Sequence, residues 1–217
     1  MEEEVVSVLR RNGAAIIGFS SGRGITVPAA MLAEIPLSKG TRADPDEIAA
    51  KTAEKAGAYC LRQVLLWQAR RDHASEEMKR RLVMMGYPSG AADEALEQLK
   101  KCGAVSDRRC CESLVRSKKR RRGREGLMME MRARGVDAET AAAALESEMD
   151  EAEEARSALR QAADMLRRGK DREKVFLGLR RRGYSRSLCV KALEEALRET
   201  AEDGEENIHQ NEILWQE

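Results

Sequence analysis

Aromatic residues are scarce in this sequence, at 3% of its 217 residues, and histidine occurs only twice. A core with few aromatic rings has to be packed from Leu, Val, Met and Ala, most of which favour helices. Scarce aromatics also argue against recognition of single strands by base stacking. No proline follows Pro88, so glycines and short polar turns have to end the helices there.

The sequence also lacks the residue patterns of a catalytic or metal centre. An odd number of irregularly spaced cysteines, with no CxxC pair, argues against a disulfide framework or structural zinc and fits a reducing compartment. These cysteines are Cys60, Cys102, Cys110, Cys111 and Cys189. Gly22-Arg23-Gly24 lacks the Lys-Ser/Thr of a phosphate loop. We predict no enzyme, no cofactor, no metal and no small-molecule substrate.

Long hydrophobic runs are missing as well. The longest apolar stretch is Ala14 to Phe19, far shorter than a membrane span. The start Met1-Glu2-Glu3-Glu4 has neither the basic residues nor the apolar stretch of a signal peptide. We therefore expect a cytoplasmic protein without a membrane partner.

The charge is distributed unevenly along the chain, although its formal net value is only +1. Residues 58–198 carry 32 Lys or Arg against 23 Asp or Glu, a net charge of +9, whereas residues 199–217 carry seven acidic residues and no basic one. A basic body indicates an anionic partner, for which the acidic tail could compete. The alternative is a solvated helical surface.

Residues 1–43 differ from the rest of the chain. They contain short β-prone runs separated by turn residues, and Asn12-Gly13 is a strong hairpin signal, so we predict two or three short strands. Asp44-Pro45 then predicts a helix start, with Asp44 as the cap. We expect Gly57 to kink or divide this helix before Tyr59.

Three glycines, Gly86, Gly135 and Gly183, mark an internal repeat with spacings of 49 and 48 residues. An apolar residue precedes each glycine by four positions and another by eight, and an Ala-Leu pair follows nine and ten positions later. Apolar residues four apart share a helix face, and a glycine one turn further suits a left-handed cap. With a helix preceding each of these pairs, every repeat is predicted to contain three helices.

The predicted fold is mainly α, with three tandem three-helix repeats forming an elongated curved array behind a small β-containing region. We place a linker helix and the first repeat at 44–104, the second repeat at 105–149 and the third at 150–198. One such unit buries little surface, so stacked neighbours extend the core. Residues 199–217 are predicted to be an acidic flexible tail, although Ile213-Leu214-Trp215 could dock back.

Basic residues recur beside the junction of the first two helices of each repeat, and they are the candidate binding residues. The densest cluster, between 116 and 124, could bind a polyanion or an acidic protein groove, or simply form a solubilising loop. Some of the others are expected to cap helix C-termini. The candidates are Arg70, Arg71, Lys79, Arg80, Arg81, Lys118, Lys119, Arg120, Arg121, Arg122, Arg124, Arg167, Arg168, Lys170, Arg180, Arg181 and Arg182.

Two other features have weaker chemical interpretations. His73 precedes a predicted helix, where a capping or surface role is favoured over catalysis. Arg108 and Arg109 could lower the pKa of the thiols in Cys110-Cys111. No histidine partner is evident for these cysteines, so we expect them to pack inside a helix.

The chain resembles the RecX family of bacterial recombination regulators. The resemblance rests on Arg70-Arg71-Asp72-His73 with Gly86-Tyr87, on Gly103 to Arg108, on Gly135-Val136, and on Arg181 to Ser185, and it covers about 58–198. Ala74 departs from the family's usual serine cap, and Cys110-Cys111 replaces its usual aromatic-alanine pair.

The resemblance implies a partner, the RecA recombinase filament on single-stranded DNA. Family members are understood to lie in the filament groove and to modulate, most often inhibit, ATP hydrolysis and strand exchange. Low-specificity contact with single- or double-stranded DNA would be a secondary activity. The alternative is a stand-alone, sequence-nonspecific DNA-binding helical protein. We expect a monomer in either case.

Overall fold

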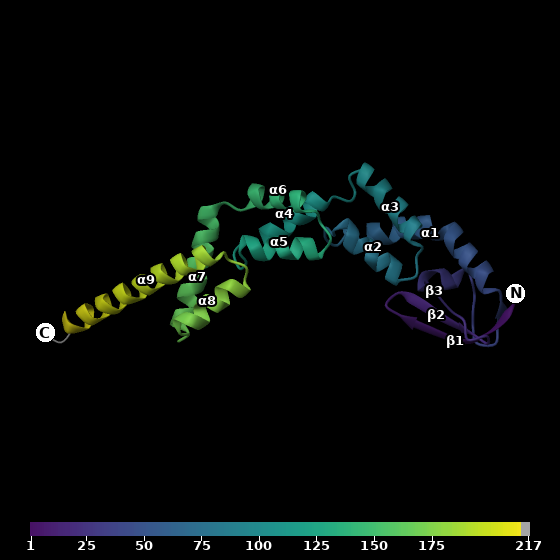
Figure 1. Ribbon diagram of the computed structural model, residues 1–217, viewed down its shortest axis with the longest axis horizontal. Coiled ribbons are helices and arrows are strands. Elements are labelled where there is room, and N and C mark those ends of the chain that lie inside the picture. Colours follow the sequence, from purple (N-terminus) through teal and green to yellow (C-terminus); the bar gives the residue numbers. More distant parts are fainter. Residues whose placement is uncertain (214–217) are drawn as a thin grey trace. The chain divides into compact units, whose positions relative to one another are not determined.

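The computed structural model describes the backbone of residues 1–213 and the side chains of residues 1–200. The chain forms two compact units, Met1–Asp107 and Arg108–Glu217 (Figure 1). Each unit has its own buried core.

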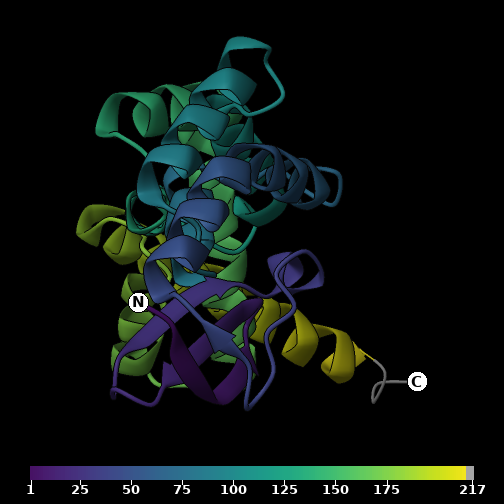
Figure 2. The same ribbon diagram turned by 90° about the vertical axis from the view of Figure 1, so that its right-hand side faces the viewer.

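The first unit begins with a four-stranded antiparallel sheet, drawn in purple to dark blue in Figure 2. Its strands are β1 (Glu3–Arg11), β2 (Ala14–Phe19), β3 (Gly24–Pro28) and β4 (Arg42–Ala43), in the order β3-β2-β1-β4. Asn12 and Gly13 connect β1 to β2 with positive φ values of 52° and 83°, so the predicted hairpin is confirmed. The two-residue strand β4 and the 3₁₀ helix η1 (Ala29–Ala33) were not predicted.

Helix α1 (Pro45–Gln68) corrects one sequence-based expectation. Its cap is as predicted, because the Asp44 side chain accepts a hydrogen bond from the Asp46 amide at 2.9 Å. Gly57 neither kinks nor divides the helix, which is continuous over 24 residues. Ala56 and Cys60 on either side of Gly57 are fully buried, and this packing outweighs the cost of about 1 kcal/mol for a helical glycine.

The remaining helices follow the predicted order. The first repeat is completed by α2 (Ser75–Met84) and α3 (Ser89–Lys101), and the second contains α4 (Asp107–Lys118), α5 (Arg124–Ala133) and α6 (Ala138–Glu148). The third contains α7 (Glu151–Arg167), α8 (Arg172–Arg181) and α9 (Arg186–Ile213). The fold class, three helical repeats behind a small sheet, is therefore as predicted, while the curvature of the array stays a prediction.

Glycine ends the second helix of every repeat in the same way. Gly86, Gly135 and Gly183 have φ values of 92°, 89° and 81°. The amide of the next residue donates back to the carbonyl of the last buried apolar residue of the helix, as Tyr87 does to Leu82 at 3.1 Å. The equivalent distances are 3.2 Å in the second repeat and 3.4 Å in the third. This bonding pattern is the Schellman motif, which the spacing of the glycines had indicated.

The second helices of the first two repeats receive their N-terminal cap from the helix that follows the repeat. Ala74 and Gly123, at the cap positions of α2 and α5, supply no side-chain bond. Asp107 accepts from the Ser75 amide at 2.7 Å, and Glu154 accepts from the Arg124 amide at 2.8 Å. A carboxylate from the next repeat therefore supplies the cap that the local residue lacks.

The last helix extends further than the third repeat was predicted to reach. Its backbone continues past residue 198 to Ile213. The predicted flexible tail falls on 199–217, of which side chains from 201 onward and all of 214–217 lie outside the described residues. The suggested docking of Ile213-Leu214-Trp215 lies outside them too.

Candidate functional site

The basic residues of the first unit lie at the end of α1 and along α2. Among their partners, Lys79 pairs with Asp93 at 2.7 Å, and Arg71 lies 3.6 Å from Glu77. Arg80 bonds the carbonyl of Glu76 at 3.3 Å, and Arg81 stacks on Trp67. Arg70 is exposed and forms no ion pair with the described side chains.

His73 is buried, which differs from the capping or surface role expected for it. Its side chain is 6% exposed, and its Nδ1 lies 3.3 Å from a Glu77 carboxylate oxygen. Burial and the charge of Arg71 lower the pKa of His73, although Glu77 partly opposes the shift. The backbone amide of His73 donates to the Gln68 side chain at 3.1 Å, so this residue helps to fix the turn between α1 and α2.

The dense basic segment of the second unit is not a free loop. Helix α4 extends to Lys118, and α5 begins at Arg124. Lys118 pairs with Glu130 at 2.6 Å, and Lys119 pairs with Glu153 at 2.9 Å. These lysines therefore tie the end of α4 to α5 and to α7.

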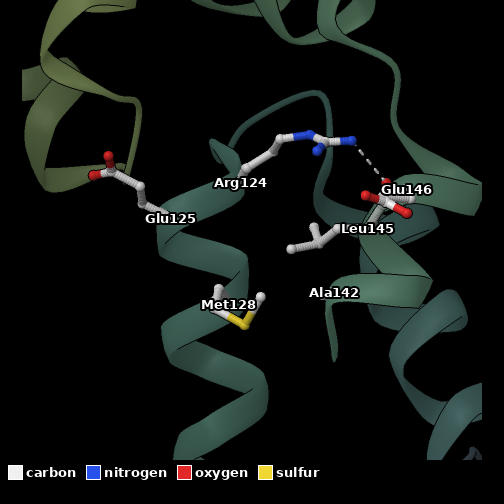
Figure 3. A pocket seen from close by; sticks show the side chains of 6 residues that line it. All are labelled: Arg124, Glu125, Met128, Ala142, Leu145 and Glu146. Carbon is white, nitrogen blue, oxygen red and sulfur yellow. Dashed lines mark hydrogen bonds between the residues drawn. The ribbon is translucent and has the colours of Figure 1, made fainter. Parts of the chain in front are cut away.

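Arg124 also stabilises the fold. Its guanidinium donates to the backbone carbonyls of Leu145 and Met149 near the end of α6, the former at 3.1 Å. Figure 3 shows this side chain reaching from α5 to α6 across a small hollow that Met128 and Leu145 also line. Glu125 and Glu146 lie at the same hollow, and their charge makes it an unsuitable site for a phosphate.

Glu130 is the acceptor around which several of these cations gather. Arg134 donates to it at 2.8 Å, as Lys118 does at 2.6 Å, and Arg122 lies 3.9 Å away. Burial alone would raise the pKa of Glu130, but the hydrogen bonds from Lys118 and Arg134 outweigh it and lower the pKa. The folded structure therefore favours the ionised form of Glu130.

The third repeat contributes a shallow basic groove along one face of α8. Its lining residues are Lys170, Lys174, Leu177, Gly178, Arg181 and Arg182. Lys170 and Arg181 are exposed and form no ion pair with the described side chains. Lys174 was not among the predicted binding residues. It lies on α8 four residues before Gly178, so these two share one helix face, whereas Lys170 precedes the Asp171 cap of the helix.

Backbone contacts between the second and third repeats bring their basic residues together. The Gly123 amide donates to the Arg182 carbonyl at 3.1 Å, and the Gly126 amide donates to the Gly183 carbonyl at 3.2 Å. A Cβ on Gly183 would lie 2.1 Å from the Gly126 nitrogen, so only glycine permits this approach. The contact places the turn containing Arg121 beside the end of α8.

We call the resulting surface the basic junction. It combines the turn between α4 and α5 with the α8 groove, and it consists of Arg120, Arg121, Arg122, Lys170, Lys174 and Arg181. Arg120 and Arg121 are exposed and without ion pairs among the described side chains. Arg120 and Arg121 can therefore bind phosphates without first breaking an internal ion pair, whereas Lys174 is paired with Asp171 at 2.7 Å.

Most of the other candidate residues of the third repeat form internal ion pairs or hydrogen bonds, or lie apart from the basic junction. Arg180 pairs with Glu125 at 2.9 Å, and Arg182 donates to the Gly178 carbonyl at 3.0 Å. Arg168 pairs with Asp164 at 3.1 Å on α7, next to the exposed Arg167.

Groups suited to other chemistry are few in the described part of the chain. Burial raises the pKa of the Cys60 and Cys189 thiols to about 11, which keeps them protonated near neutral pH. No three His, Cys, Asp or Glu side chains among the described residues are placed to hold a metal ion. Within the same residues, no helix is both long and apolar enough to cross a bilayer.

The fold and this surface define a class of protein, helical-repeat proteins with an exposed basic surface. The family model described as "RecX, second three-helix domain" matches residues 106–145. The regulatory protein RecX of Streptomyces coelicolor is 31% identical over 176 residues, which are 77% of this chain and 91% of that protein. That of Mycolicibacterium vanbaalenii is 34% identical over 161 residues, 68% of this chain and 84% of that protein. The chain belongs to the RecX family.

Solved structures show the same fold. A crystal structure of regulatory protein RecX aligns with a TM-score of 0.58 at 20% identity, over 89% of this chain and 99% of that one. A crystal structure of RecX from Lactobacillus salivarius aligns with the same TM-score at 16% identity, over 66% of this chain and 97% of that one. The resemblance noted in the sequence is therefore confirmed.

Proposed function

We propose that this chain is a non-catalytic regulatory protein that binds the RecA recombinase filament on single-stranded DNA and lowers its ATPase and strand-exchange activity. Its relatives carry the name regulatory protein RecX. RecA as the partner, and inhibition as the effect, come from the family resemblance. A cytoplasmic monomer remains our expectation.

The observation that carries the proposal is the basic junction. Arg120, Arg121 and Arg181 present charges that no described carboxylate neutralises. Cations of this kind release counterions from a polyanion and bind it without sequence preference. The arrangement suits contact with the phosphates of filament-bound DNA, because 3% aromatic residues offer few surfaces for stacking bases.

The test is the single-strand-dependent ATPase of RecA from the source organism, titrated with this protein at fixed salt. A dose-dependent fall at less than one copy per RecA subunit is expected, because a protein lying along a filament affects many subunits. An unchanged or increased rate across the titration would contradict inhibition.

A stand-alone DNA-binding protein is the second candidate, and the same unpaired arginines favour it. The two functions differ in their need for RecA. Binding of a fluorescent thymidine oligonucleotide, measured by anisotropy at several salt concentrations, should be weak without RecA and strengthened by its filament. Tight binding that RecA leaves unchanged, together with an unaffected ATPase, would favour the second candidate.

A further inference from the structure

The first unit contains an apolar pocket that the proposed function does not use. Asn12 in the β1–β2 turn, the last turns of α1 and the end of α2 surround it, and we call it the hairpin pocket. It is lined by Asn12, Gln63, Trp67, Arg81, Met84 and Met85. Three elements far apart in the sequence therefore converge on one surface.

The walls of the hairpin pocket are fixed by tight turns. Met85 packs against the β1–β2 turn, with its Cε 2.7 Å from the place where a Cβ on Gly13 would lie. Gly86 similarly packs on β3, where its Cβ would lie 2.9 Å from the Val27 carbonyl carbon. The end of α2 is thereby held against the sheet, so the pocket is formed before any partner arrives.

The chemistry of the lining is that of a protein-binding surface. Met84 is 72% exposed and lines the pocket together with Trp67 and Met85, so these side chains present apolar surface to solvent. The Arg81 guanidinium lies 5.2 Å from the Trp67 ring centroid. Trp, Met and Arg are enriched in the cores of protein interfaces, and Trp and Arg dominate their binding energy.

Arg81 can accept a second carboxylate. Its contact with Glu77 is long, at 3.8 Å, and 47% of its side chain is exposed. Its planar guanidinium has several donors and recognises carboxylates in pairs of hydrogen bonds. No acidic residue lines the pocket, and the exposed Arg11 and Arg62 adjoin its lining residues Asn12 and Gln63 in the sequence.

We propose that the hairpin pocket binds an acidic segment of a partner protein, with an apolar side chain between Trp67 and Met84 and a neighbouring carboxylate on Arg81. This site is independent of the proposed function and of the basic junction. A nucleic acid fits the pocket less well, because Arg81 is the only cation in the lining and already lies over the Trp67 ring.

The probe for this proposal is a fluorescein-labelled peptide, Asp-Asp-Phe-Leu-Asp-Asp, with its ends blocked. Its anisotropy is measured with the full chain in which Ile213, Leu214 and Trp215 are replaced by serine, which leaves Trp67 as the only tryptophan. Saturable binding with a shift in Trp67 emission is expected. Replacing Phe-Leu by Ser-Ser in the peptide should weaken binding at least about tenfold, because the apolar anchor is lost.

Two matched variants locate the site. Arg81→Glu should weaken binding at least about tenfold, whereas Arg80→Glu, the same charge change one residue earlier and outside the pocket, should change it less than about twofold. Met84→Ser tests the apolar wall without a charge change and should also weaken binding. Melting temperatures of all variants are measured to confirm folding.

Four results would overturn the proposal. Absence of saturable binding to the folded protein would remove the site, and equal losses in Arg80→Glu and Arg81→Glu would reduce it to general charge attraction. A thymidine oligonucleotide that shifts Trp67 emission, with sensitivity to Met84→Ser, would make it a nucleic-acid site. Probe binding at least about tenfold tighter to the serine-tail chain than to the natural chain would make the chain's own C-terminal segment the occupant.

Discussion

In the first and third repeats, the second helix ends in the same glycine turn, but this turn packs against different elements. In the first unit, Gly86 packs on the backbone of Thr26 and Val27 in strand β3. In the second unit, Gly183 packs on the backbone of Gly126 in helix α5. Both glycines have the same left-handed conformation and the same Schellman bonds.

The difference shows that one local motif can serve two kinds of contact. The Schellman corner needs only an apolar residue, a glycine and a following apolar residue, which every repeat contains. The surface against which the corner packs depends on other residues. Gly123 and Gly126 in the second repeat make α5 narrow enough for backbone contact, whereas the first repeat receives a strand.

The largest expected effect comes from Gly183→Ala. Alanine at this position would be strained by the left-handed φ of 81°, and its Cβ would lie 2.1 Å from the Gly126 nitrogen. Strain and overpacking together should lower the free energy of unfolding by more than about 3 kcal/mol. Urea denaturation of the full chain measures the change.

Gly169→Ala is the matched control within the same unit. Gly169 also has a positive φ, of 76°, but nothing lies within 4 Å of a Cβ there, so the cost should be about 1 kcal/mol. Gly86→Ala should fall between the two, because its nearest atom is 2.9 Å away. Equal losses at Gly183 and Gly169 would show that the α5–α8 contact is looser than described.

The second prediction compares the two carboxylates that cap a preceding helix. Glu154→Ala leaves the Arg124 amide without its acceptor and removes the carboxylate nearest its side chain, so we expect a loss of about 2 kcal/mol. Asp107→Ala should cost about 1 kcal/mol, because the Asp107 side chain is 24% exposed against 10% for Glu154. Glu154→Gln keeps an acceptor and should restore part of the stability, and a reversed order of the two alanine variants would contradict this ranking.

The third prediction concerns acid. The pKa of Glu130 is lowered in the folded state, so its charge stabilises the fold above the ordinary value of 4.5, and this contribution is lost as pH falls through the lower folded value. Glu130→Gln lacks the contribution at every pH. The difference in melting temperature between natural chain and variant should therefore shrink below about pH 4.5. A constant difference down to pH 2 would show that Glu130 is not held by Lys118 and Arg134.

Much of the fold could be predicted from local patterns. The hairpin at Asn12-Gly13, the cap at Asp44 and the glycine corners each depend on residues close in sequence. The continuity of α1 through Gly57 could not be predicted, because it depends on the burial of Ala56 and Cys60 against other elements. Strand β4 was also missed, because two residues carry no periodic signal and their pairing with the distant strand β1 is not visible in the local sequence.

The candidate site was less predictable than the fold. The density of positive charge at 116–124 located a basic region, but charge alone cannot show which cations meet internal carboxylates. Lys118 and Lys119 are bound to glutamates at least 12 positions away in the sequence, whereas Arg120 and Arg121 are not. Lys174 was missed because it alternates with acidic residues in the run Lys170-Asp171-Arg172-Glu173-Lys174, and its place in the basic groove depends on the helical geometry of α8.

The smallest expected effect on stability distinguishes exposed cations from ion-paired ones among the four consecutive residues 118–121. Arg120→Glu with Arg121→Glu should change the free energy of unfolding by less than about 0.5 kcal/mol, because both side chains are exposed and unpaired among the described residues. Lys118→Glu with Lys119→Glu should cost about 2 kcal/mol, because two ion pairs become repulsive contacts with Glu130 and Glu153.

DNA binding should respond in the opposite order to stability. The arginine pair should lower the slope of log affinity against log salt by about 1.4 on single-stranded DNA, since each phosphate contact contributes about 0.7. Anisotropy titrations at several salt concentrations, made on variants that remain folded, measure this slope. If the arginine variant binds DNA and inhibits RecA as the natural chain does, the basic junction has no part in regulation. The unpaired charge of Arg120 and Arg121 would then serve only solubility.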